Sequence, residues 1–201
     1  MTLAESNTSY VEAKARLLSD SQLSPGAFGI FRIQGYWYNE FRSPGSGQDY
    51  NGYEGDVFVQ LRLQYDSDGT LRARANVGRS DGANEDPWTT LFSQDFSTPI
   101  QFDTDYIISI EYKDSQLIFK CNNETITYTI TTSEYVPYGE HRALRTRIYL
   151  DPGESGYMKA QFDDVYIDTD VSDGGVSPDK PTLSLPVNGA MDVSLTPTLQ
   201  T

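Results

Sequence analysis

Two neighbouring segments alternate strictly between apolar and polar side chains, and this pattern constrains the fold more than any other. In VFVQLRLQY, residues 57–65, apolar side chains recur at every second position, with Phe58, Gln60, Arg62 and Gln64 between them. The turn signal DSDG (66–69) leads into TLRARANV (70–77), which alternates in the same way. A period of two places successive side chains on opposite faces of a strand. Asp-Gly between two such segments is typical of a tight turn. The sequence therefore predicts a half-buried β-hairpin.

The same pattern recurs along the chain, and helical periodicity is nearly absent. Gly, Asp, Pro and Ser clusters separate the segments, which is typical of antiparallel sandwiches and barrels. Residues 27–33 and 36–41 are predicted to form a hairpin that turns at Gln34-Gly35. We expect about ten or more strands, the others covering residues 11–17, 106–113, 116–121, 125–130, 143–150 and 157–168.

Composition and charge limit the partners of the chain. The formal net charge is −14, from 29 acidic and 15 basic residues. Nucleic acids and anionic membranes attract lysine and arginine, so neither is an expected partner. An acidic balance suits calcium-binding loops, but it also simply keeps a protein soluble. No apolar run is long enough to enter a bilayer as a helix. The single cysteine, Cys121, cannot form an internal disulfide and is predicted to be a small buried hydrophobe.

The composition changes after Asp168. Residues 169–180, TDVSDGGVSPDK, lack an apolar pattern and are predicted to be a linker. Residues 181–201, PTLSLPVNGAMDVSLTPTLQT, resemble the opening strands of a fibronectin type III-like or immunoglobulin-like repeat. So short a segment cannot bury a core of its own. We therefore expect a modular parent protein, located outside the cell or at its surface, whose neighbouring domains contact this chain and whose export signal lies outside it.

Residues 1–168 are predicted to form one domain, and four stretches of it carry a family resemblance. They are GIFRIQGYWYNEF, GDVFVQLRL, DYIISIEYKDSQLIFKCNNETITY and AQFDDVYID. With these stretches the chain resembles the concanavalin A-like lectin/glucanase superfamily. The resemblance implies an all-β fold, an antiparallel two-sheet jelly-roll sandwich. It does not select a function, because this fold carries lectins, hydrolases, lyases and adhesion modules.

Catalytic residues typical of the superfamily's enzymes are missing. The Glu-x-Asp-x-x-Glu strand of laminarinase-type glucanases has no match. One histidine, His141, and one cysteine cannot supply a three-histidine or thiolate zinc site. On a strand, the Cα atoms of Glu54 and Asp56 would lie about 6.6–6.8 Å apart on one face, within the range of inverting glycosidases. A solvated turn is the interpretation we favour for this pair. We expect no enzymatic activity.

Two acidic segments are candidate calcium sites, and no cofactor is required otherwise. DSDG (66–69) begins like a calcium loop but runs directly into a strand, which favours a plain turn. In the closing strand, alternation predicts that either Asp163 or Asp164 points inward or to the sheet edge while its neighbour faces the other way, and an inward carboxylate needs a counter-ion. The resemblance to jelly-roll carbohydrate-binding modules implies a structural calcium at Asp164, or at Asp163 if the register differs.

Six aromatic rings lie within residues 35–56. Tyr36, Trp37 and Tyr38 are predicted to be mostly core. The later tyrosines lie among Gly, Ser, Gln, Asp and Asn, a composition that suits sugar recognition by ring stacking and hydrogen bonds to hydroxyls. The alternative is that these tyrosines cover the edge of the sandwich. The candidate ligand-binding residues are Tyr50, Tyr53, Asn51, Gln48, Asp49 and Trp88.

The predicted function is a non-catalytic carbohydrate-binding or adhesion module with a polysaccharide or glycan as its partner. Two alternatives remain from the sequence. One is a structural spacer domain without a ligand, and the other is a polysaccharide-cleaving enzyme.

Overall fold

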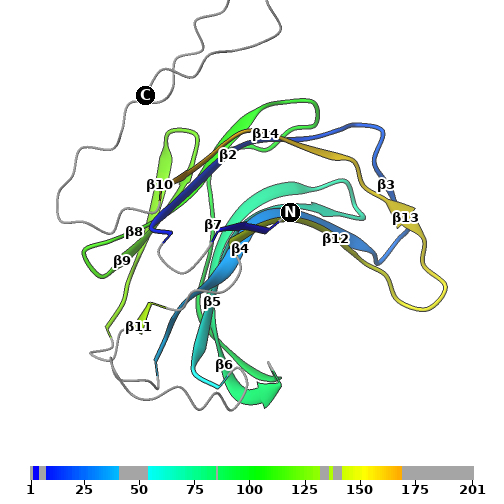
Figure 1. Cartoon of the computed structure of the whole chain (residues 1–201). Helices are drawn as coiled ribbons and strands as arrows, with labels where there is room; N and C mark the ends of the chain where they lie inside the picture. The colour runs from blue at the N-terminus through cyan, green and yellow to red at the C-terminus, as the bar shows by residue number, and fades with distance from the viewer. Residues whose placement is uncertain are drawn as a thin grey trace, which may run out of the picture.

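The computed structural model describes residues 2–4, 8–40, 54–84, 86–131, 136–137 and 142–168. All regular secondary structure in these ranges is β-strand, and the strands form two large antiparallel sheets that face each other (Figure 1). No helix in the described part could span a membrane. The predicted all-β, two-sheet sandwich, arranged as in a jelly roll, is confirmed.

The larger sheet has the strand order β1-β12-β4-β5-β6-β7, and β11 also pairs with β4. Figure 1 shows this sheet curving from β12 to β6, with the face opposite the core on the inside of the curve. Its strands are β1 (Thr2–Ala4), β12 (Arg142–Tyr149), β4 (Phe28–Asn39), β5 (Asp56–Asp66), β6 (Leu71–Asn84), β7 (Asp86–Asp95) and β11 (Val136–Pro137).

The smaller sheet has the order β10-β9-β8-β2-β14. A separate short pair, β3 (Gln22–Leu23) with β13 (Gly156–Tyr157), lies at one end of the sandwich (Figure 1). The strands of the smaller sheet are β10 (Glu124–Thr129), β9 (Gln116–Cys121), β8 (Tyr106–Lys113), β2 (Tyr10–Leu17) and β14 (Ala160–Asp168).

The hairpin predicted from alternation is confirmed as β5 and β6. Its turn closes with a hydrogen bond from the Gly69 backbone N–H to the Asp66 carbonyl, 2.9 Å. Gly69 has a φ of +87°, a conformation that glycine adopts at little cost. Val57, Val59, Leu61 and Leu63 are all at most 1% exposed. The apolar half of the pattern therefore faces the second sheet, as expected.

Residues 28–39 form one continuous strand, so the predicted turn at Gln34-Gly35 is wrong. Gln34 pairs with Gln60, and Gly35 pairs with Val59, inside the sheet. A glycine can lie in a strand interior where neighbouring strands cover both of its sides. The irregularity lies further on, between Tyr36 and Tyr38, where the register of β4 against β5 shifts. Strand β7 was not predicted from the sequence.

The core lies between the two sheets and consists of apolar side chains from both. Phe31 and Leu61 of the larger sheet and Phe119 and Ile108 of the smaller sheet are fully buried. Cys121 belongs to the same cluster, and burial raises the pKa of its thiol to about 12. The prediction that this cysteine acts as a buried hydrophobe is confirmed.

The described residues end at Asp168, in β14, so the predicted domain boundary at this residue stays a prediction. The predicted linker, residues 169–180, and the fibronectin-like segment, residues 181–201, lie outside the described residues. Both remain predictions.

Candidate functional site

The candidate site is the outer face of the larger sheet, which we define as the face opposite the core. In antiparallel pairing, residues directly opposite each other on neighbouring strands become side-chain neighbours. On this face they form rows that cross the strands. Two of them are the amide row (Gln34, Gln60, Asn76 and Ser93) and the arginine row (Arg145, Arg32, Arg62 and Arg74). We call Tyr36, Phe58 and Trp88 the aromatic row: Tyr36 and Phe58 are directly opposite each other, and Trp88, which pairs with Ser80, reaches Phe58 diagonally across Gly78.

The aromatic row joins three rings edge to face. The Tyr36 and Phe58 ring centroids are 5.3 Å apart, and those of Phe58 and Trp88 are 5.9 Å apart. The Trp88 ring covers Gly78, where any Cβ atom would overlap the indole. Trp88 is nevertheless 39% exposed. Because Gly78 has no side chain, the Trp88 ring can pack directly on the sheet, and part of the ring stays accessible to a ligand.

The amide row lies next to the rings and holds polar atoms with spare hydrogen-bonding capacity. Asn76 Nδ2 donates to Ser93 Oγ at 2.8 Å, and Arg32 Nη1 donates to Gln60 Oε1. Gln34 Oε1 and Asn76 Oδ1 are buried without a hydrogen-bond partner among the described residues. Buried polar atoms normally have partners. Both oxygens are exceptions to this rule, and their burial keeps them out of direct contact with the cleft.

The arginine row consists of four arginines on four adjacent strands. Arg145 pairs with Arg32, Arg32 with Arg62, and Arg62 with Arg74. The row ends at Asp95 of β7, which pairs with Arg74 and accepts a hydrogen bond from its Nη2 at 2.8 Å. This ion pair lowers the pKa of Asp95. Asp95 is thus the one carboxylate in line with four guanidinium groups.

Burial lowers the pKa of the two central arginines of the row, Arg32 and Arg62. Arg32 is only 6% exposed, and its burial, together with the nearby charges of Arg145 and Arg62, lowers its pKa to about 10. Burial is also the main cause of the lowered pKa of Arg62, and Arg74 adds to it. The Nε atoms of Arg32 and Arg62 lack a hydrogen-bond partner in the described part of the chain. Both guanidinium groups keep their charge at neutral pH, but in an environment that disfavours it.

The rows meet in a cleft of about 330 Å³. Aromatic rings, guanidinium groups and amide groups all line this cleft, so one ligand could contact all three. The cleft is lined by Phe58, Gln60, Arg62, Arg74, Asn76, Val77, Gly78, Trp88, Thr90 and Ser93.

Of the predicted ligand-binding residues, the structure places Trp88 in this cleft. The other five, Gln48, Asp49, Tyr50, Asn51 and Tyr53, lie outside the described residues, as does His141. The sequence did not single out the arginine row. Part of this row could have been found from the predicted hairpin, because a turn at residues 66–69 places Arg62 opposite Arg74.

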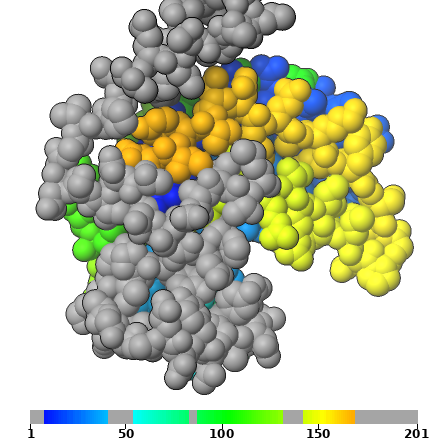
Figure 2. All heavy atoms as spheres, viewed as in Figure 1, coloured from blue at the N-terminus to red at the C-terminus, as the bar shows by residue number. Residues whose placement is uncertain are grey.

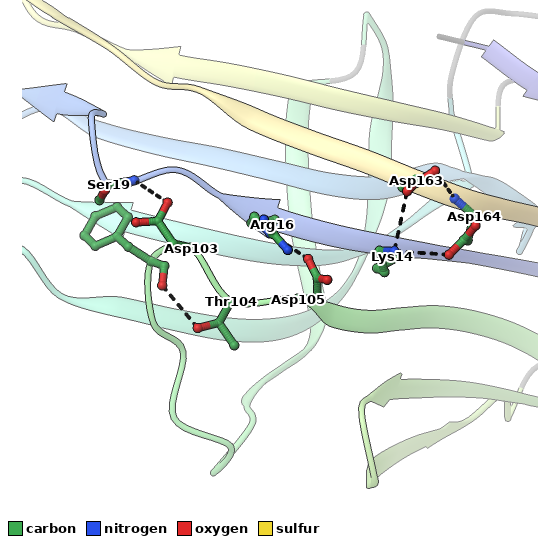
Figure 3. Close-up of polar contacts among 9 residues, drawn as sticks. Lys14, Arg16, Ser19, Asp103, Thr104, Asp105, Asp163 and Asp164 are labelled. Atoms are coloured by element: carbon green, nitrogen blue, oxygen red, sulfur yellow. Dashed lines mark hydrogen bonds and ion pairs between the residues drawn. The ribbon is translucent and has the colours of Figure 1, made fainter. Parts of the chain in front are cut away.

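Asp163 and Asp164 both lie on the surface of β14, the edge strand of the smaller sheet, so an inward carboxylate is wrong and the alternative, a position at the sheet edge, holds. Their side chains are 69% and 73% exposed, and Lys14 Nζ lies 3.4 Å and 3.2 Å from their carboxylate oxygens (Figure 3). The alternation fails because Asp164 has a φ of +47° and the pairing with β2 shifts between Asp163 and Tyr166.

The residues around this pair do not fit a calcium ion. Calcium takes six to eight oxygen ligands, whereas these two carboxylates share an ammonium group. Across the described ranges, no three His, Cys, Asp or Glu side chains gather closely enough to hold a metal. Asp66-Ser67-Asp68-Gly69 forms the β5–β6 turn described above.

The two carboxylates of the other candidate pair, Glu54 and Asp56, differ in solvent exposure. Glu54 is exposed in a turn, whereas Asp56 begins β5, is fully buried, and accepts a hydrogen bond from Asn39 Nδ2 at 2.7 Å. Glu54 therefore does not lie on a strand with Asp56, and the strand spacing that suggested a catalytic pair does not apply.

The sequence matches no protein-family model and no curated protein. Among solved structures, scytalido-glutamic peptidase with a transition state analogue is similar at 14% identity and a TM-score of 0.48, over 83% of this chain and 77% of that one. A carbohydrate-binding module from Bacillus subtilis is similar at 12% identity and a TM-score of 0.38, over 82% and 77%. A Bacteroides ovatus mixed linkage glucan GH16 in complex with its product is similar at 10% identity and a TM-score of 0.43, over 69% and 54%. These proteins differ in function, so similarity at this level does not choose among them.

Proposed function

We propose that the domain is a non-catalytic carbohydrate-binding or adhesion module and that the outer face of the larger sheet binds the glycan. The observation that carries the proposal is the cleft, where an accessible indole ring lies next to amide side chains. Sugar rings have apolar faces that stack on aromatic rings, and their hydroxyls need hydrogen-bond partners at the same time. A wall of Phe58 and Trp88 beside Gln60 and Asn76 meets both needs.

The composition of the cleft favours binding over cleavage. Polysaccharide hydrolysis needs two carboxyl groups on either side of the scissile bond. The described lining of the cleft contains none. Compared with a spacer without a ligand, a binding module is favoured by the cleft that Trp88 shares with the amide side chains.

The wider setting remains part of the proposal. We place the module outside the cell or at its surface, within a longer polypeptide whose other domains adjoin it. Residues Gln48, Asp49, Tyr50, Asn51 and Tyr53 are proposed to add contacts to the glycan. A structural calcium is not needed for this function.

A glycan-array screen of the full chain, followed by calorimetry on the best glycan, tests the proposal. The Trp88→Ala variant should lose binding. The matched control is Tyr157→Ala, which removes a ring that is 44% exposed on β13, away from the cleft, and should bind normally. Equal binding by both variants, or no glycan bound by a folded wild-type chain, would refute the proposal. Measuring product formation in parallel tests for cleavage.

A further inference from the structure

We infer that the arginine row recognises negatively charged groups, carboxylate or sulfate, on an acidic polysaccharide. This inference rests on the proposed function, since it specifies the class of glycan that the outer face would select. Its basis is the register of the larger sheet together with the position of Arg62 and Arg74 in the lining of the cleft.

The chain concentrates its positive charge on this face. The protein has a net charge of −14 and only 15 lysines and arginines in total. Six arginines have their register positions on the outer face, the four of the row and two at the next positions along β6 and β12. The two additional residues are Arg72, which is paired with Asp66, and Arg147. An acidic protein with a basic binding face attracts anions there and repels them elsewhere.

The arrangement is unfavourable without an anion. Like charges directly opposite each other on neighbouring strands destabilise a sheet. Neighbouring strands are about 4.8 Å apart, so each central arginine has a cation on both sides. Asp95 neutralises only the end of the row, through Arg74. An anion bound in the cleft at Arg62 would relieve the repulsion.

Of the two central arginines, Arg62 can accept such an anion, because it lines the cleft. Among the described residues, no carboxylate lies within ion-pair distance of Arg62, whereas Arg74 is paired with Asp95. A guanidinium group binds carboxylate or sulfate oxygens through two parallel hydrogen bonds. Part of the arginine row is also accessible, because Arg145 on β12 is exposed. Figure 2 shows β12, in yellow-green, at the surface of the molecule.

Position in the cleft points to a polysaccharide rather than to a small free anion. Arg62 and Arg74 line the same cleft as Phe58 and Trp88. A ligand that fills it would place an apolar surface on the rings and an acidic group at the arginines. A sugar unit that carries a carboxylate or sulfate has both features.

The experiment compares polymers that differ only in charge. Polygalacturonate is measured against its methyl ester, and dextran sulfate against dextran, by calorimetry at low salt and at 1 M salt. The first pair reports on carboxylates and the second on sulfates. The variants are Arg62→Gln and Arg145→Gln, with Arg16→Gln as the matched control. Arg16 lies on the smaller sheet and forms an ion pair with Asp105 at 2.6 Å (Figure 3). Thermal unfolding verifies that each variant is folded.

We expect at least one charged polymer to bind more tightly than its neutral counterpart and to weaken in high salt. Arg62→Gln should weaken it about ten-fold to a hundred-fold, as loss of a hydrogen bond to a charged group does. Arg16→Gln should have no effect. Neutral polymers that bind equally well, with no loss in Arg62→Gln, would overturn the inference and leave the proposed function intact. Polyglutamate, included as a non-sugar polyanion, would overturn both if it bound through the same arginines while no glycan bound.

Discussion

Neutralising the centre of the arginine row should stabilise the protein. In an Arg62→Met variant, Met keeps much of the apolar stem and removes a charge that faces Arg32 and Arg74. Favourable cross-strand pairs are worth about 0.2–1 kcal/mol and like-charged pairs are destabilising, so we take the same range, with opposite sign, for each arginine pair. Two pairs give about 0.4–2 kcal/mol, and removing a buried Nε without a partner adds to the gain. Since Asp95 already compensates Arg74, we expect the free energy of unfolding to rise by about 1 kcal/mol.

Urea denaturation of the wild-type chain and the variant measures this difference directly. The Debye length falls from about 10 Å at 0.1 M salt to about 3 Å at 1 M, so the gain should shrink in high salt. Arg16→Met is the control, because it breaks an ion pair with Asp105 instead of relieving a repulsion. Its effect should have the opposite sign.

A decrease in the stability of Arg62→Met, or a gain that does not depend on salt, would refute the reasoning. The first result would mean that favourable contacts hold the guanidinium group. The second would mean that removing the buried, unpartnered Nε, and not relief of repulsion along the row, causes the gain. If Arg62→Met gains stability and loses anion binding, Arg62 lowers the stability of the fold but is needed for binding.

Three further predictions follow from the same structure. Gly78→Ala should displace the Trp88 ring, which a change in tryptophan fluorescence would report, together with weaker glycan binding; unchanged fluorescence and affinity would contradict the packing described. Phe119→Ala should lower the free energy of unfolding by about 3–5 kcal/mol in urea, because the ring is fully buried, and a loss below 1 kcal/mol would not fit a packed core. Hydrogen bonds from the backbone and hydroxyl groups of Ser97 and Thr98 lower the pKa of Glu124 to about 2. Its contribution to stability is therefore complete above about pH 4.5 and is lost as the pH falls toward 2. Glu124→Gln should flatten acid unfolding in this window, and an unchanged pH profile would count against these bonds.

Alternation alone predicted the strands whose two faces differ in polarity. Residues 57–65 became β5 with the expected residues buried, and the Asp-Gly turn led to β6. It failed where both faces are covered. Along β4 nearly every residue is buried, so apolar side chains show no period of two that would mark one continuous strand. Gly35 then predicts a turn where the strand in fact continues. The bulge at Asp164 is a backbone conformation that alternation cannot report.

The candidate site was harder to predict, because it depends on contacts between distant segments. Trp88 could be singled out as a ring in a polar context. The meeting of Arg145 with Arg32 depends on β12 pairing with β4, which more than a hundred intervening residues separate. Only the link from Arg62 to Arg74 lies within one hairpin, and counting outward from its turn would have found it.

The arginine row also has a consequence for how the chain finds its native fold. A strand that slipped by one residue would turn its outer-face side chains toward the core. For β4, β5 or β6, that error would bury at least one guanidinium group among apolar side chains, at a high cost in free energy. The arginines thus penalise wrong alignments of the central strands. A fully neutral face would lack this penalty. The resulting protein would be more stable once folded, but its strands would pair out of register more often and the misfolded chains would aggregate more readily.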